Sequence, residues 1–248
     1  MRTSPLTLLA FALLLVNCRD DTVIRQPTEN ETYPIVITAG AFRYVLHDDV
    51  TREQAAHIGD SLLSNYERIM RHLRVGTMPQ VTISLWAPGH SNDFYAEMES
   101  RIGQVYRGAT GYTPTNSEMC LLWNPSTPKS AVHEYAHLVS IALKPDIGNN
   151  PRWLWEAIAQ YESRTYERPA DWTPDQRAFP GFAALNQYNS VLPYRWGYTI
   201  CAFIIDRWGD DAYISTINAN GNIPSALGIT EEEFGTLTEE YVKSMAGS

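Results

Sequence analysis

The sequence predicts an α+β fold in which a small mixed sheet comes before a helical half. Runs with strand character occur only within residues 34–123, and the pattern after residue 126 is helical to the end. Strands first and helices afterwards are typical of α+β domains, because each group then buries one face against a neighbouring layer. We expect one domain over residues 34–248, with an α/β lobe over 34–146 and a helical lobe over 147–248.

The first elements follow from side-chain alternation and helix capping. Two short runs rich in β-branched and aromatic residues, Ile35–Thr38 and Phe42–Leu46, are separated by a glycine and are predicted to be strands. Thr51 and Gln54 form a capping box, which marks the start of a helix. Apolar residues then keep helical spacing, so we expect this helix to continue as far as Gly76.

Three further strands are expected before the helical half begins. Apolar and polar residues alternate over residues 81–85, as they do in a half-buried strand. Residues 104–110 and 118–123 also have strand character, and Pro, Asn and Thr residues indicate a turn around 113–116. The predicted sheet therefore ends with two strands joined by a short turn.

A pair of capped helices opens the second half of the chain. The first is expected over residues 127–143, because a Thr-Pro pair marks its start and a Lys-Pro pair follows its end. Asn150 and Pro151 repeat the starting pattern, and the second helix is expected to reach about Tyr166. Helices joined by so short a loop tend to pack antiparallel.

This helix pair carries residues with the spacing of a zinc site. His133 and His137 lie at i and i+4, so both imidazoles leave one face of the first helix. Glu134 projects about 100° around the helix from His133, where a general base for zinc-bound water would lie. Glu156, two turns into the second helix, would face the histidines as third ligand. The alternative is an amphipathic helix with two chance histidines and Glu156 as a surface charge.

The combination resembles a known group of enzymes. His-Glu-x-x-His, eighteen further residues and then Glu within Trp-Leu-Trp-Glu is similar to the gluzincin metallopeptidases, which include thermolysin and the aminopeptidase N-like enzymes. The resemblance covers residues 105–209 and implies a zincin-like fold, a Zn²⁺ cofactor and hydrolysis of peptide bonds. Tyr194 begins a Tyr-x-x-Gly segment, which by the same resemblance implies that it stabilises the tetrahedral intermediate. Tyr198 and Tyr161 are the alternatives for that role.

The chain departs from the family at two places. Ala157 follows the third ligand where the family usually has Gly, and we expect close helix packing to survive because Ala is small. Residues 108–112 replace the segment with which aminopeptidases bind a free N-terminus, so an endopeptidase is the expected activity. The family also implies that the strand over 118–123 lies at the sheet edge and pairs with an extended substrate. The alternative is an interior strand without that role.

Several residues near the motif have two interpretations. Gln160, one turn beyond Glu156, could orient a zinc histidine through a hydrogen bond. Cys120 and Cys201 either pair in an oxidising compartment or remain free buried thiols. Four tryptophans near the motif either line a substrate cleft or pack in the core: Trp123, Trp153, Trp155 and Trp196. The other histidines lack ligand spacing and are expected at the surface or with hydrogen-bond partners: His47, His57, His72 and His90.

The N-terminal residues indicate export. Arg2 and the apolar run over 6–16, too short to span a bilayer, predict a signal peptide over residues 1–17. Cys18 follows directly and resembles the lipidated cysteine of a bacterial lipobox, and the acidic residues after it resemble a surface-export signal. Residues 18–33 would then be a polar, lipid-anchored tether. The alternative is an ordinary signal peptide with an incidental cysteine.

The net charge of the chain limits the classes of molecule that it could bind. The formal net charge of −9 argues against nucleic acid and anionic lipid surfaces as partners. We therefore expect an exported zinc peptidase that meets the membrane only through its lipid anchor at the cell envelope. Its substrate would be a peptide or protein. The alternatives are a glycopeptidase that acts on glycosylated proteins and a non-catalytic lipoprotein that uses the site for binding.

Overall fold

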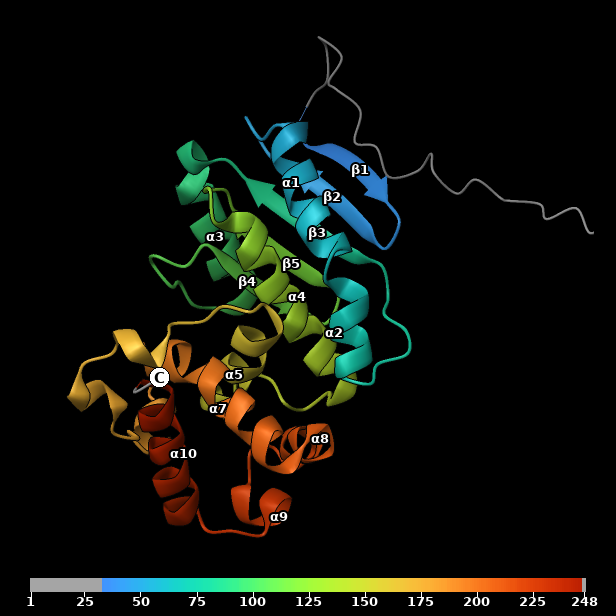
Figure 1. Ribbon diagram of the computed structural model, residues 1–248. Coiled ribbons are helices and arrows are strands. Elements are labelled where there is room, and N and C mark those ends of the chain that lie inside the picture. Colours follow the sequence, from blue (N-terminus) through green and yellow to red (C-terminus); the bar gives the residue numbers. More distant parts are fainter. Residues whose placement is uncertain (1–32, 247–248) are drawn as a thin grey trace, which may run out of the picture.

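The computed structural model describes residues 33–246 and shows a sheet lobe next to a helical lobe (Figure 1). The predicted signal peptide, the lipidation site at Cys18 and all but the last residue of the predicted tether lie outside the described residues. Helix α4, which carries both histidines of the motif, extends from the sheet to the helical lobe (Figure 1). The predicted α+β class is therefore confirmed, while the domain bounds stay a prediction.

The elements alternate between strands and helices only in the first lobe. The strands are β1 (Ile35–Ala39), β2 (Phe42–Leu46), β3 (Val81–Trp86), β4 (Gly111–Thr115) and β5 (Glu118–Leu122). The α-helices are α1 (Arg52–Leu63), α2 (Tyr66–His72), α3 (Ser91–Ile102), α4 (Thr127–Leu143), α5 (Arg152–Glu162), α6 (Phe182–Leu185), α7 (Leu192–Trp208), α8 (Asp210–Asn218), α9 (Ile223–Leu227) and α10 (Glu231–Ala246). Short 3-10 helices are η1 (Pro88–His90), η2 (Pro169–Asp171) and η3 (Pro174–Arg177).

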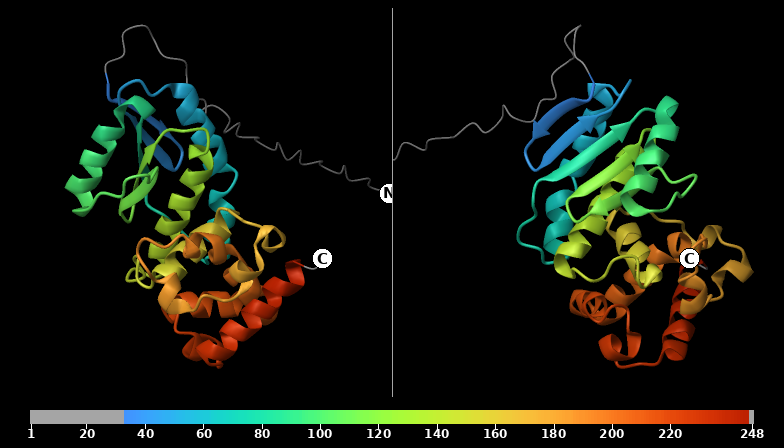
Figure 2. Two further views of the ribbon diagram at one scale, coloured as in Figure 1. Left: turned by 90° about the vertical axis from the view of Figure 1, so that its left-hand side faces the viewer. Right: turned by 180° about the vertical axis from the view of Figure 1, so that it is seen from behind.

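The five strands form one mixed sheet in the order β1-β2-β3-β5-β4. The three central strands, β2, β3 and β5, run parallel to one another. The edge strands β1 and β4 are antiparallel to the strands that they pair with. Side chains alternate across the sheet, so Met119 and Leu121 of β5 join the main core beneath α1 and α4. Cys120 and Leu122 point to the other face, which α3 covers with Phe94 among others (Figure 2).

Two predictions about the end of the sheet were wrong. Residues 104–110 form a loop, because Gly108 takes a positive φ of 97° and a turn joins Tyr106 to Ala109. Strand β4 begins only at Gly111, and the turn to β5 falls after Thr115. The expected edge strand over 118–123 is also interior, since β5 lies between β3 and β4. Its nearly continuous buried run is the pattern of a strand covered on both faces.

The predicted helix after Thr51 is interrupted. Thr51 and Gln54 form the expected capping box, with N···O distances of 2.9 and 3.2 Å. The helix then stops at Leu63, because the side chains of Ser64 and Asn65 donate hydrogen bonds to backbone carbonyls of the preceding turn. α2 continues the same stretch as a separate helix, and α3 was not predicted at all.

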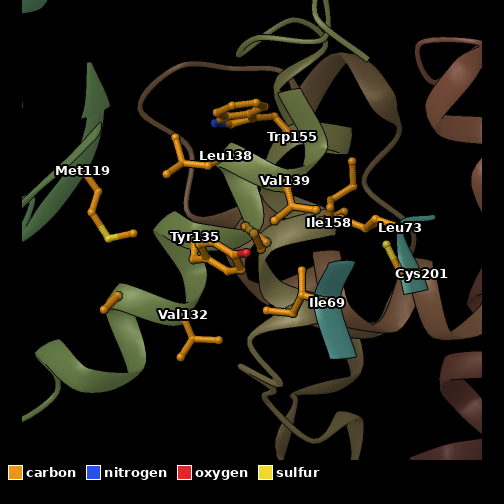
Figure 3. Packing of buried hydrophobic residues seen from close by; sticks show 14 of the residues in the cluster. Ile69, Leu73, Met119, Val132, Tyr135, Leu138, Val139, Trp155, Ile158 and Cys201 are labelled. Atoms are coloured by element: carbon orange, nitrogen blue, oxygen red, sulfur yellow. The ribbon is translucent and has the colours of Figure 1, made fainter. Parts of the chain in front are cut away.

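The helix pair that carries the motif closely follows its prediction. α4 has the expected bounds, and α5 ends at Glu162, four residues before the predicted end. α7 packs tightly against α5, since a Cβ on Gly197 would lie 2.8 Å from the Cα of Ala157. The expectation that Ala157 permits close helix packing is confirmed. Buried residues of α2, α4 and α5, such as Ile69, Val139 and Ile158, fill the space between these helices (Figure 3).

Both described cysteines are free and buried, and they belong to separate core clusters. Cys120 faces α3 across the sheet, and Cys201 lies within α7. The disulfide alternative is therefore wrong, and these residues behave as small core side chains. Among residues 33–246, the helices are all too short or too polar to cross a bilayer.

Candidate metal centre

Three predicted ligands meet where α4 faces α5. His133 and His137 leave the same face of α4, with their ring centroids 4.7 Å apart. The Oε2 of Glu156, from α5, lies 3.3 Å from the Nε2 of His133 and 3.9 Å from the Nε2 of His137. One nitrogen or oxygen atom of each residue lies within 4.8 Å of the others, so the group could hold a metal ion.

Packing fixes the orientation of the inner histidine. The ring of His137 stacks on Trp155, with centroids 4.0 Å apart and planes inclined by 6°. Trp155 belongs to α5 and immediately precedes the ligand Glu156, so one helix turn both supports His137 and supplies the third ligand. Both side chains are buried, and a ring held between packed neighbours has few alternative rotamers.

Charge and burial set the protonation of the three side chains. Burial and the neighbouring His133 lower the pKa of His137 to about 3, so this imidazole is neutral at pH 7. Burial alone would raise the pKa of Glu156, but the histidines and Arg152 outweigh it and lower the value to about 2. For His133, burial opposes the charged form, yet the Glu156 carboxylate raises its pKa.

The carboxylate of Glu156 uses its two oxygens differently. Tyr194 donates a hydrogen bond to Oε1 at 3.0 Å, and the Nη1 of Arg152 lies 3.2 Å from the same oxygen. Arg152 also donates from Nη2 to the Tyr194 hydroxyl at 3.0 Å. Oε2, in contrast, is buried without a hydrogen-bond partner and lies beside the histidines. A buried oxygen without a partner is costly, and a metal ion would satisfy it.

Arg152 is a site residue that sequence reasoning missed. It begins α5 and lies one turn before Glu156, so the i, i+4 spacing was the available signal. Its guanidinium lies over the ring of Tyr194, 5.5 Å from the centroid, and over the ring of Tyr188 at 5.3 Å. Arg152 therefore positions both the ligand carboxylate and the tyrosine.

Glu134 lies next to the ligands and against the sheet edge. Its side chain is 8% exposed, and burial raises its pKa to about 7 although His133 opposes that shift. A Cβ on Gly111, in edge strand β4, would lie 2.8 Å from its Oε1. A larger residue would force the carboxylate to shift, so β4 and the Glu134 carboxylate are in close contact.

The remaining predicted residues have mixed outcomes. Tyr194 lies at the centre, whereas Tyr198 and Tyr161 pack against each other and line a different cavity. The Oε1 of Gln160 and the Nδ1 of His137 are both buried without a hydrogen-bond partner, so the expected hydrogen bond between Gln160 and a histidine is not formed through these atoms. Three of the four tryptophans are buried and support the core interpretation: Trp153, Trp155 and Trp196.

The other histidines have partners away from the centre. His47 stacks on Trp86 at 4.0 Å, and the Nδ1 of His90 lies 3.0 Å from Asp93. His72 lies 2.6 Å from the buried Glu162. His57 is exposed, so all four histidines lie at the surface or have partners, as expected.

The fold and the three ligands define a class of site. A His-Glu-x-x-His helix beneath a mixed sheet, with a carboxylate from the next helix, is consistent with a zincin-like metal centre. Two imidazole nitrogens and one carboxylate oxygen form a donor set that suits a transition-metal ion. Comparison with protein families, with curated proteins and with solved structures finds no match for this chain.

Proposed function

We propose that this protein is a zinc-dependent peptidase of the gluzincin type, most simply an endopeptidase. The observation that carries the proposal is the meeting of His133, His137 and Glu156 beside the carboxylate of Glu134. His133, His137 and Glu156 would hold Zn²⁺. When bound there, the ion would polarise a substrate carbonyl and make a water molecule more acidic.

Glu134 is proposed to move the proton. Its carboxylate would accept a proton from the attacking water and later give it to the amine that leaves when the peptide bond breaks. The contact between Gly111 and Glu134 supports this role, because it places the carboxylate at the edge of the sheet, where a substrate could lie. Glu134 is not one of the three grouped ligands, which leaves it available as a base.

The substrate is proposed to bind along β4, not along β5 as the family resemblance suggested. β4 is the edge strand nearest the centre, and β5 is already paired on both sides. An extended peptide could add to the free edge through backbone hydrogen bonds, which depend little on side chains. Such a peptide would lie close to Glu134, since Gly111 begins this strand.

Tyr194 is proposed to stabilise the negative charge that forms on the carbonyl oxygen. Its hydroxyl already lies at the centre, 3.0 Å from Glu156, and Arg152 approaches the same hydroxyl. Partial burial and the Glu156 carboxylate raise the pKa of Tyr194, so the phenol keeps its proton and can donate it in a hydrogen bond. In this arrangement a substrate oxygen would compete with Glu156 for that donor.

The alternatives receive less support. A glycopeptidase would need tryptophan faces near the motif that a sugar can reach, but Trp153, Trp155 and Trp196 are at most 7% exposed, and of the four only Trp123 is partly exposed. A non-catalytic binding protein would have no need of a carboxylate at position 134. Action outside the cytoplasm is proposed from the N-terminal sequence signals alone.

The decisive experiment pairs metal analysis with a cleavage assay. Purified protein should contain about one zinc per chain and should cleave casein or a peptide library, with activity lost to a chelator and restored by Zn²⁺. Glu134→Gln should keep its zinc and its melting temperature while turnover falls by at least about 10²-fold, as expected for loss of a general base. Bound zinc without any cleavage would favour the binding protein, and an active Glu134→Gln would overturn the mechanism.

A further inference from the structure

A second cavity, of about 730 Å³, lies away from the candidate metal centre. Its lining residues come from α2 and the residues after it, from the end of α5, from α7 and from the start of α8. None of the three ligands nor Glu134 lines it. Its walls include the rings of Tyr161 and Tyr198, and its volume falls in the range of small-molecule sites. The lining residues are Arg68, Arg71, His72, Arg74, Tyr161, Arg164, Tyr198 and Asp210.

Positive charge gathers here although the protein as a whole is acidic. Four arginines line the cavity, against one lining carboxylate, in a chain with a net charge of −9. Two of the four are already neutralised: Arg68 pairs with the buried Glu162 at 3.0 Å, and Arg74 pairs with Asp211. The single lining carboxylate, Asp210, lies 3.6 Å from His72.

The other two arginines of the cavity, Arg71 and Arg164, form no ion pair with the described residues. Both are exposed, and neither side chain has a carboxylate or carbonyl acceptor among residues 33–246. In addition, the Nε of Arg68 is buried in the wall without a partner. Like charges in one cavity repel each other, so a set of uncommitted guanidinium donors favours an anion that can accept from several of them.

The backbone conformation of two cavity arginines is an independent observation in favour of a role for their side chains. Arg74 and Arg164 have positive φ angles of 57° and 54°, at the ends of α2 and α5. Glycine or asparagine normally takes that position, because a β-carbon is strained there. A cation does favour the end of a helix, but a lysine or arginine within the last turn would serve that purpose without the strain.

We propose that this cavity binds a phosphorylated small molecule, and that Arg71 and Arg164 donate hydrogen bonds to its phosphate monoester group. A phosphate monoester carries close to two negative charges at pH 7 and three acceptor oxygens, which matches two uncommitted guanidiniums. The tyrosine walls would contact the uncharged part of the ligand. This site is separate from the proposed peptidase centre and does not depend on it.

Calorimetry with the whole chain tests the proposal. Inorganic phosphate and glucose 6-phosphate should bind, and glucose and chloride at equal ionic strength should not. A further titration uses sulfate, which is also a dianion. Comparing its affinity with that of phosphate shows whether the site distinguishes phosphate from dianions in general. The double variant Arg71→Gln with Arg164→Gln should bind phosphate at least about tenfold more weakly, since it loses two charge-assisted contacts. The matched control, Arg107→Gln with Arg207→Gln, removes the same charge from two exposed arginines elsewhere and should bind normally.

A second variant separates binding from stability. Arg164→Gly relieves the positive φ, so it should raise the melting temperature without ligand and reduce the further rise that phosphate causes. If phosphate binds the double variant as well as it binds the control, the anion lies elsewhere, such as at the metal centre, and the proposal is wrong. If phosphate does not bind the unchanged protein at all, the arginines serve only the helix ends and the proposal is equally wrong.

Discussion

Gly111→Ala tests the contact between the sheet edge and Glu134 without altering any group that does chemistry. A methyl group at position 111 would lie 2.8 Å from the Oε1 and 3.1 Å from the Cγ of Glu134, against an ordinary contact distance of 3.4 Å or more. The carboxylate therefore has to move by roughly half an ångström. Because displacements near 1 Å can cost about 10²-fold in rate, we expect kcat/KM to fall by about tenfold to a hundredfold.

The fold should tolerate this change. The nearest atom is the end of a flexible side chain, so the free energy of unfolding should fall by no more than about 1 kcal/mol, the lower end for overpacking. Zinc content should stay at the wild-type level, because His133, His137 and Glu156 are untouched. Gly76→Ala is the matched control, since a Cβ there would contact nothing within 4 Å. A Gly111→Ala protein with full zinc and wild-type kcat/KM would refute the proposed contact between β4 and the general base.

Two further predictions concern tyrosine and histidine. Tyr194→Phe should lower kcat by about 10²–10³-fold with little change in KM if the hydroxyl stabilises the oxyanion, whereas weaker zinc binding at unchanged kcat would show that it only orients Glu156. His72 has its pKa raised above 6.5 by Glu162, so the stability it contributes is present at low pH and lost as pH rises through the raised value. Denaturant unfolding should therefore show a larger gap between wild type and His72→Gln at about pH 5.5 than at about pH 9, and a constant gap would contradict this.

The parts of the fold that were predictable are those in which local chemistry decides the structure. The capping box of Thr51 and Gln54 set a helix start, and alternation set β3. The bounds of α4 followed from a Thr-Pro pair and a Lys-Pro pair alone. One error lies where distant contacts decide, since the order of strands placed β5 inside the sheet. The other is local and was overlooked: the side chains of Ser64 and Asn65 compete for backbone carbonyls four residues earlier and divide a helix whose apolar spacing is continuous.

The candidate site shows the same division. His133, Glu134 and His137 could be read from one helix, and Glu156 from the cap of the next. Arg152 was missed although its spacing to Glu156 was visible, because an i, i+4 pair on a helix is usually no more than a surface contact. The approach of Gly111 to Glu134 could not be predicted at all, since it depends on how the sheet edge lies over α4.

The ligands of the centre come from different parts of the molecule, and this has a mechanical consequence. His133 and His137 belong to the helix beneath the sheet, and Glu156 belongs to the helical lobe, while the two described cysteines, Cys120 and Cys201, are free. A bound ion would therefore cross-link the two helices much as a disulfide would, closing a ring of chain from α4 to α5. Removing it should first loosen the turn between these helices, so that amide hydrogens of residues 144–151 and the first turn of α5 exchange faster while those of the central strands remain protected.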